Sequence, residues 1–219
     1  MVIAAFVQAR MSSRRFPGKT LAPFRGRPVI AHVLDRVRSV SAIDPTKVVL
    51  LTSTDSSDDP LASYVGSLGV EVHRGPLDDV FARFQRCAAG RGADWIARIN
   101  GDSPLMSPMI LEAVIASAGA DWDVVTTIMP RTLPKGQNPE LIRAETLLRT
   151  DPAKLSADHR EHVTQYYYQH PEEFRIASLH SNRPELADLN FSIDTVEDLR
   201  RLEAMPQAEI DRLLQVSFV

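Results

Sequence analysis

The sequence predicts an α/β fold with a mostly parallel sheet. Short apolar runs alternate along the chain with segments of helical periodicity, a rhythm typical of strand–helix–strand units with right-handed crossovers. The predicted strands are almost continuously apolar, as expected where helices cover both faces of a sheet. No repeat or linker interrupts the pattern, so residues 1–219 are expected to form one domain.

Most of the predicted alternation of strands and helices lies in residues 1–128. Val2–Gln8 is the first predicted strand, residues 9–27 form a polar loop, and a helix begins at Pro28, because proline suits the first helical turn. Gly69 is expected to close the next helix. The remaining strands are predicted at Lys47–Thr52, Val70–His73, Asp94–Ile99 and Trp122–Ile128, and the helices at Asp59–Leu68, Asp78–Ala89 and from Pro108, with Asp78 and Ser107 as N-caps.

The rhythm breaks after residue 128. Residues 129–139 carry three prolines and a glycine and are predicted to be a functional loop. Two helices are expected to close the chain from Thr195, separated near Pro206. Between them lie predicted helices at Ala144–Arg149 and Glu161–His170 and predicted strands at Phe174–Leu179 and Leu189–Ile193.

Composition excludes several classes of protein. With 44% hydrophobic and 24% charged residues, the chain is not generally disordered, and no apolar run is long enough to cross a bilayer. Cys87 is the only cysteine, which excludes a disulfide framework and a thiolate zinc site. We therefore expect a cytoplasmic protein without membrane partners.

Charge is unevenly distributed. The chain has 25 Lys and Arg against 28 Asp and Glu, yet residues 1–34 contain six cations and no acid. Residues 35–219 are acidic overall, which argues against nucleic acid as a partner. A short basic segment instead suits one compact polyanion such as a nucleoside triphosphate. A solvated surface loop is the alternative interpretation.

The basic segment follows the first strand, and ligands of doubly wound sheets bind beyond the carboxyl ends of strands. Its sequence, Q-A-R-M-S-S-R-R-F-P-G-K at 8–19, is neither a dinucleotide-binding nor a P-loop motif. Hydroxyls, a glycine and four cations could nevertheless wrap a triphosphate. Thr52–Asp55 and Asn100–Pro104 follow two other strands and are further candidate segments.

Two aspartates are candidate metal ligands. Asp102, in N-G-D-S-P, could bind Mg²⁺ together with phosphate oxygens and water, or could form an Asx-turn. Asp194, in S-I-D-T, could do the same, or it or Thr195 could cap the following helix with Glu197 or Asp198. The block D-H-R-E-H-V-T at 158–164 lacks zinc-ligand spacing.

Two further groups receive structural interpretations. Asp55, Asp58 and Asp59 are predicted to form a solvated acidic turn at the start of a helix. The consecutive residues Tyr166, Tyr167 and Tyr168 are predicted to pack at a surface or a subunit contact, because no basic residue lies among them.

Four motifs together resemble a cytidylyltransferase family, the one that includes spore coat polysaccharide biosynthesis protein F and is related to acylneuraminate and 3-deoxy-manno-octulosonate cytidylyltransferases. They are the loop at 8–19, N-G-D-S-P at 100–104, R-E-H-V-T at 160–164 and S-I-D-T at 192–195. The resemblance implies the nucleotide-diphospho-sugar transferase fold, a Rossmann-like three-layer α/β/α sandwich. It also implies Mg²⁺-dependent transfer of CMP from CTP to an acceptor, with release of pyrophosphate.

The same resemblance implies roles for individual residues. The triphosphate is assigned to Arg10, Ser12, Arg14 and Lys19, of which Arg10 and Lys19 are the catalytic cations. The wall that reads the base is assigned to Gln8, Ala9 and the backbone of Thr52–Thr54, which includes Ser53. The Mg²⁺ ligands are Asp102, which also contacts the nucleotide, and Asp194. The acceptor side is assigned to Arg160, Glu161 and His162. Since such a reaction requires mainly positioning and neutralisation of charge, no catalytic base is expected.

One departure from the family pattern bears on the acceptor. Where relatives carry P-x-G-x-D-x-E, this chain has P-K-G-Q-N-P-E at 134–140, so Asn138 replaces an acid. Arg131, Lys135 and Glu140 are therefore predicted to bind a small anionic acceptor: an acidic sugar, a sugar phosphate or a phosphonate. A merely solvated loop is the alternative. The resemblance further implies a homodimer with residues of about 170–194 as a dimerisation arm.

Two other functions fit the predicted fold. A glycosyltransferase would use a D-x-D metal motif, which Asp121–Asp123 spells, although at the beginning of a predicted strand. A catalytically idle nucleotide-binding module would bind CTP without releasing pyrophosphate. The presence of Lys19, Asp102 and Asp194 together favours the nucleotidyltransferase.

Overall fold

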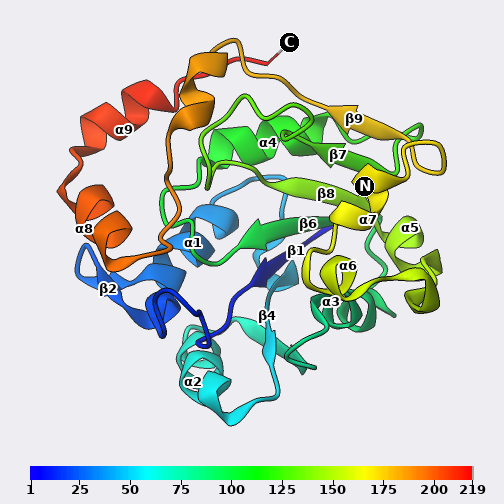
Figure 1. Ribbon diagram of the computed structural model, residues 1–219, viewed down its shortest axis with the longest axis horizontal. Helices are drawn as coiled ribbons and strands as arrows, with labels where there is room; N and C mark the ends of the chain where they lie inside the picture. The colour runs from blue at the N-terminus through cyan, green and yellow to red at the C-terminus, as the bar shows by residue number, and fades with distance from the viewer. Residues whose placement is uncertain (219) are drawn as a thin grey trace.

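A seven-stranded sheet forms the centre of the computed structural model, which describes residues 1–218 (Figure 1). The strand order is β5-β4-β1-β6-β8-β7-β9. The strands are β1 (Ile3–Gln8), β4 (Val48–Ser53), β5 (Glu71–Gly75), β6 (Trp95–Asn100), β7 (Val124–Thr126), β8 (Glu140–Arg143) and β9 (Ile176–Ser178), and a separate hairpin joins β2 (Pro23–Phe24) to β3 (Arg27–Pro28).

The sheet is mixed but mostly parallel, as predicted. Strand β1 pairs in parallel with β4 and β6, β4 with β5, and β7 with β9. The exception is β8, which is antiparallel to both of its neighbours, β6 and β7. The carboxyl ends of β1, β4, β5 and β6 therefore meet at one edge of the sheet, where ligands of such folds bind.

Helices cover both faces of the sheet. One core cluster packs α1, α2 and α4 against the sheet, and a second packs α3, α5 and α7 against the opposite face. This arrangement explains why the strand residues are buried on both sides. The helices are α1 (Val29–Arg38), α2 (Asp59–Ser67), α3 (Val80–Ala88), α4 (Pro108–Ala116), α5 (Ala144–Arg149), α6 (Ala157–Glu161), α7 (Gln165–Gln169), α8 (Val196–Ala204) and α9 (Gln207–Leu213).

Helix caps differ in part from the predictions. Asp79 rather than Asp78 caps α3, by accepting a hydrogen bond from the Ala82 backbone N–H at 2.8 Å. Ser107 does precede α4, but its side chain makes no capping bond. Helix α8 begins with a reciprocal capping box between Thr195 and Asp198. The Thr195 side chain therefore accepts a hydrogen bond from a backbone N–H group in the first turn of α8.

The chain past residue 128 differs from the predictions in three places. Strand β8 was not predicted: the expected loop ended at residue 139, the next predicted helix began at Ala144, and no element was assigned to residues 140–143. The helix expected at Glu161–His170 is divided into α6 and α7, because the chain turns at His162 and buries Val163. Leu189–Ile193 is extended but belongs to no strand, and it meets the 134–137 loop through a single bridge, Lys135 with Asn190.

The segment 170–194 packs on its own chain, where β9 pairs with β7 at the edge of the sheet. Its predicted role as a dimerisation arm stays a prediction. Among residues 1–218, no helix is both long enough and apolar enough to span a bilayer.

Candidate active site

The basic loop after β1 is folded back over the end of β4. The Met11 backbone N–H donates to Asp58 Oδ1 at 2.6 Å, and the other Asp58 oxygen accepts from the Ser53 N–H at 3.0 Å. Gly18 adopts a left-handed conformation, with φ of 77°, and donates to the Met11 carbonyl. The prediction that Asp58 lies in a solvated turn is wrong, because its side chain is fully buried and holds this loop.

Lys19 lies between the two candidate metal ligands. Its Nζ donates to Asp102 Oδ2 at 2.6 Å and to Asp194 Oδ1 at 3.0 Å, and the side chain is largely buried. The two aspartates are brought together by the backbone, since the Ile193 N–H donates to the Asp102 carbonyl at 2.8 Å. Three segments that are remote in sequence therefore converge on one cluster of charges.

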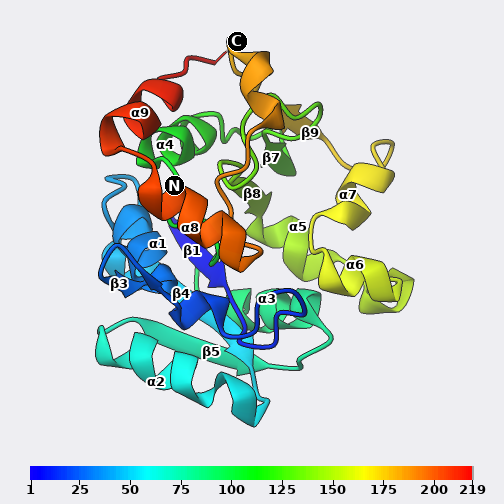
Figure 2. The same ribbon diagram turned by 60° about the vertical axis from the view of Figure 1, so that its left-hand side comes forward.

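The C-terminal helices hold Asp194 in place. Phe191 and Ile193, just before it, pack with Phe24 and Leu202 in a third core cluster. This cluster joins α8 and α9 to α1 and the β2–β3 hairpin, which lie beside them in Figure 2. On the other side, the Phe191 N–H donates to the Lys135 carbonyl at 2.7 Å.

Gly136 allows the 189–193 segment to pass close to the 134–137 loop. It has φ of 87°, and a Cβ atom there would lie 2.7 Å from backbone atoms of Phe191 and Ser192. We expect Gly136→Ala to lower the free energy of unfolding by about 3 kcal/mol, from backbone strain and overpacking together. Gly26→Ala is the matched control, since Gly26 has φ of 80° but open space around it; about 1 kcal/mol is expected there. Urea unfolding of both variants measures the difference, and equal losses would contradict the packing argument.

Asp194 is ionised throughout the neutral range. Burial alone would raise the pKa of this carboxyl, but hydrogen bonds from Lys135 and Lys19 outweigh burial and hold the pKa well below its ordinary value. Arg15 approaches the same carboxylate at 2.9 Å. Because the pKa is depressed, the stability that Asp194 contributes is present above its ordinary pKa of about 3.9 and is lost only as pH falls through the lowered value.

The carboxylates of Asp102 and Asp194 fit a magnesium site. Mg²⁺ in such enzymes takes one or two carboxylates and completes its shell with phosphate oxygens and water. Both side chains contact the same Lys19 nitrogen, so one small cation could contact both. Residues 1–218 contain no group of three or more His, Cys, Asp or Glu residues arranged to hold a metal without a substrate.

A pocket of about 450 Å³ surrounds this cluster. Its lining includes six residues predicted to bind the nucleotide, namely Gln8, Ala9, Arg10, Arg14, Lys19 and Asp102. Ser13 lines the pocket, whereas Ser12 points to solvent. Thr52 and Ser53 are fully buried and their side chains lie outside the lining, so the role predicted for their backbone stays a prediction.

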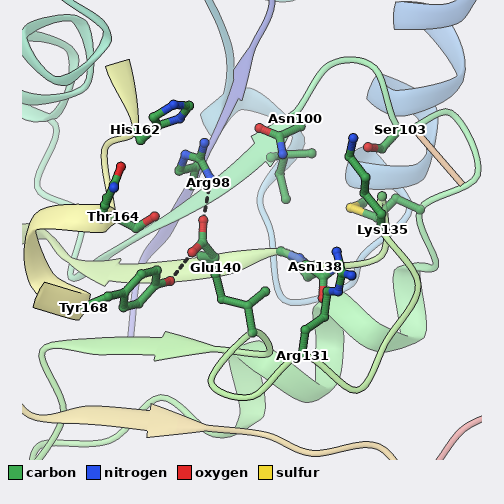
Figure 3. A pocket seen from close by; sticks show the side chains of 16 residues that line it. Arg98, Asn100, Ser103, Arg131, Lys135, Asn138, Glu140, His162, Thr164 and Tyr168 are labelled. Carbon is green, nitrogen blue, oxygen red and sulfur yellow. Dashed lines mark hydrogen bonds and ion pairs between the residues drawn. The ribbon is translucent and has the colours of Figure 1, made fainter. Parts of the chain in front are cut away.

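A second pocket of about 360 Å³ adjoins the first, and both are lined by Asn100 and His162. Arg131, Lys135 and Glu140, which were assigned to the acceptor, all line it, and their role in acceptor binding stays a prediction. Figure 3 shows the Glu140 carboxylate between Arg98 and Tyr168, and both of these residues donate hydrogen bonds to it. Glu140 is therefore neutralised within the protein, and Lys135 is paired with Asp194, so Arg131 is the cation of this lining without an ion-pair partner among residues 1–218.

The 160–162 block does not act as one unit. Of its three residues, only His162 reaches the second pocket. Arg160 pairs with Asp79 at 2.6 Å and lines neither pocket, so the structure does not bring it to the residues assigned to the acceptor side. Glu161 lines the first pocket instead of the second and accepts a hydrogen bond from Arg10 at 2.9 Å.

Two groups outside the pockets have structural roles. Asp123, the second acid of the D-x-D sequence, is buried before β7 and accepts hydrogen bonds from Thr146 and Arg149. It therefore forms no metal motif, which removes the feature that favoured a glycosyltransferase. Tyr166 and Tyr167 lie in the second core cluster of their own chain, not at a surface.

Comparisons with solved structures define the class of protein. A cytidylyltransferase from Leptospira borgpetersenii superposes with a TM-score of 0.88 at 25% identity, over 98% of this chain and 94% of that one. A CMP:2-keto-3-deoxy-manno-octonic acid synthetase in complex with CTP shares the fold, with a TM-score of 0.73 at 15% identity over 93% and 98% of the two chains. The chain has the fold of nucleotidyltransferases.

Sequence comparisons define the family. The profile described as "Cytidylyltransferase" matches residues 4–217, so the chain belongs to the cytidylyltransferase family and is an enzyme of that class. The spore coat polysaccharide biosynthesis protein SpsF of Bacillus subtilis is 29% identical over 96% of this chain and 88% of its own length. A 3-deoxy-manno-octulosonate cytidylyltransferase of Anaeromyxobacter is 31% identical over 66% of this chain and 58% of its own length.

Proposed function

We propose that this enzyme transfers CMP from CTP to a small anionic acceptor, releases pyrophosphate and depends on Mg²⁺. The observation that carries the proposal is the junction of two pockets at Asn100 and His162. One pocket holds the basic loop and both carboxylates, and the other presents Arg131 and Lys135. An acceptor in the second pocket would lie next to a nucleotide in the first.

Cations of the first loop would hold the triphosphate. Arg10, Arg14, Arg15 and Lys19 all line the first pocket. In the reaction, a bond forms between an acceptor oxygen and the α-phosphorus, while the bond from the α-phosphorus to the bridging oxygen of pyrophosphate breaks. Negative charge therefore builds up on the departing pyrophosphate, and preorganised cations stabilise it there without moving.

Asp102 and Asp194 would hold Mg²⁺, which supplies further neutralisation of phosphate oxygens when it is bound. Lys19 Nζ pairs with both carboxylates, so its ammonium group already lies beside the proposed metal site. Asp194 also pairs with Lys135 and Arg15.

The second pocket has the size and charge for an acidic monosaccharide. The Asn138 amide donates to the Pro134 carbonyl and its oxygen accepts from Thr127, so this residue braces the loop instead of adding an acid to the pocket. The SpsF relative points to a role in surface polysaccharide synthesis. The single buried cysteine is compatible with the cytoplasm, and a homodimer is part of the proposal.

A pyrophosphate-release screen tests the proposal. CTP, UTP, ATP and GTP would each be incubated with Mg²⁺ and with panels of acidic sugars, sugar phosphates and phosphonates. We expect release with CTP and one class of acidic acceptor only. Tight CTP binding without release across all panels would instead identify an idle nucleotide-binding module, and consumption of a CMP-sugar would identify a glycosyltransferase.

Arg131 offers the clearest test of the acceptor side, because it is exposed in the second pocket and has no hydrogen-bond partner among residues 1–218. We expect Arg131→Gln to raise the KM for the acceptor about tenfold, since a hydrogen bond to a charged group contributes about 1.5 kcal/mol or more. The KM for CTP should not change. Equal KM values for the acceptor in variant and parent would show that the loop is merely solvated. A substitution at Lys135 would be less specific, since Lys135 also contacts Asp194.

A further inference from the structure

Lys135 contacts both halves of the candidate site. Its side chain lines the second pocket, where Figure 3 shows it, and its Nζ donates to Oδ2 of Asp194, a residue that lines the first pocket. The Lys135 side chain is half exposed, whereas that of Asp194 is largely buried. One ammonium group therefore lines the second pocket and also contacts a proposed metal ligand.

Backbone hydrogen bonds hold Lys135 beside the segment that ends at Asp194. The Lys135 N–H donates to the Leu189 carbonyl at 2.9 Å, and the Lys135 carbonyl accepts from the Phe191 N–H at 2.7 Å. The next residue, Gly136, passes so close to Phe191 that a Cβ atom would not fit there. The fold therefore fixes the backbone of Lys135 relative to Asp194, while the half-exposed side chain retains access to the second pocket.

Lys135 has hydrogen-bond donors left for a ligand. A lysine ammonium carries three N–H donors, and within residues 1–218 only the contact with Asp194 engages them. Glu140, the acid in the lining of the second pocket, already accepts hydrogen bonds from Arg98 and Tyr168. The free donors of Lys135 are therefore available to an anionic group in that pocket.

Asp194 shares one negative charge among three cations. Arg15 and Lys19 contact its Oδ1, and Lys135 contacts its Oδ2. Lys19 has Asp102 as a second carboxylate partner, whereas Lys135 has Asp194 alone within residues 1–218. A divalent cation bound to Asp194 draws on the same charge, so the charge of Lys135 becomes less compensated and attracts an anion more strongly. An anion bound to Lys135 strengthens metal binding by the same factor, because coupling between two sites is reciprocal.

We propose that Lys135 couples acceptor binding to metal binding: its ammonium group binds the anionic group of the acceptor and, through Asp194, binds it more tightly when the metal is present. The inference rests on the proposed function, which places the metal at Asp194 and the acceptor in the second pocket. The family pattern P-x-G-x-D-x-E leaves position 135 open, so the coupling is a property of this chain. A neutral acceptor gains nothing from it, so Lys135 favours an acidic acceptor.

The test is Lys135→Met, for which two measured quantities are expected to change in opposite directions. Mn²⁺ binding in the presence of CTP, measured by electron paramagnetic resonance, should become at least about threefold tighter, because a cation that competes for Asp194 is removed. The KM for the acidic sugar selected by the pyrophosphate-release screen should rise about tenfold, because a charged donor is lost. In the parent this KM should fall as Mg²⁺ rises, and the variant should lose most of that fall. Lys135→Arg keeps the charge, so both shifts should be smaller.

Two control variants separate coupling from damage to either site. Arg131→Gln removes a cation of the same pocket that makes no ion pair with Asp194 in residues 1–218, so it should raise the KM for that acidic sugar and leave the Mn²⁺ affinity unchanged. Lys154→Met removes an exposed lysine outside both pockets, and both quantities should match the parent.

Weaker Mn²⁺ binding together with a higher KM would assign Lys135 a structural role beside Asp194 and overturn the inference. A higher KM with unchanged Mn²⁺ affinity would make Lys135 an acceptor residue without coupling, which overturns it as well. Tighter Mn²⁺ binding with an unchanged KM, or no change in either quantity, would do the same. If the parent binds CTP and Mn²⁺ but releases pyrophosphate with no acceptor, the proposed function itself fails.

Discussion

Lys19→Ala is expected to reduce the rate of pyrophosphate release by at least about 10²-fold, the scale of losing one preorganised contact to the transition state. Lys19 is largely buried and held by two carboxylates, so its ammonium group is positioned before the substrate arrives. Its charge cannot be replaced by solvent at that depth. Arg10→Ala is expected to show a loss of the same order, because Arg10 lines the same pocket and is oriented by Glu161.

The measurement is pyrophosphate release at saturating CTP, acceptor and Mg²⁺. Lys154→Ala is the matched control, because Lys154 is exposed and lies outside both pockets. Circular dichroism checks that the variants are folded. If Lys19→Ala and Arg10→Ala both release pyrophosphate at rates near that of the parent, the basic loop takes no part in the chemistry.

Asp194→Asn is expected to have an effect of similar size through the metal. The substitution keeps the shape of the side chain but removes the charge that balances Arg15, Lys19 and Lys135. It also removes one of two carboxylates available to Mg²⁺, so we expect the Mg²⁺ concentration for half-maximal activity to rise at least about tenfold and the maximal rate to fall about 10²-fold.

A Mg²⁺ titration of pyrophosphate release tests this expectation, and Mn²⁺ binding in the presence of CTP adds a measurement that does not depend on turnover. Asp188→Asn is the control, since Asp188 is exposed and lines neither pocket. An Asp194→Asn variant with the parent's metal dependence and metal affinity would assign Asp194 a purely structural role.

The sequence predicted the regular part of the fold because that part follows local patterns. Three of the four parallel strands from β1 to β6, namely β1, β4 and β6, are mostly apolar and buried, and all four are followed by a segment of helical period. Strand β8 was missed because it has four residues and begins with Glu140, whose burial depends on the remote Arg98 and Tyr168. Such long-range compensation of a charge leaves no periodic signal.

The site residues that belong to sequence motifs could be predicted. Those whose position depends on tertiary packing could be predicted less well. Lys19, Asp102 and Asp194 meet as the resemblance implies. Arg160 was grouped with its sequence neighbours, but adjacent residues of a short helix point in different directions, and its partner in the structure is Asp79. Asp58 was missed, since nothing local distinguishes a buried acid from a solvated one.

The backbone bond from Ile193 to the Asp102 carbonyl ties the chemistry to the final portion of the polypeptide. Residues 1–193 contain the parallel strands β1, β4 and β6 and the basic loop, but only one of the two acids. The active centre is therefore complete only when the segment that carries Asp194 is bound to the Asp102 carbonyl. Local unfolding of α8 and α9 would therefore abolish activity while the parallel sheet is still intact.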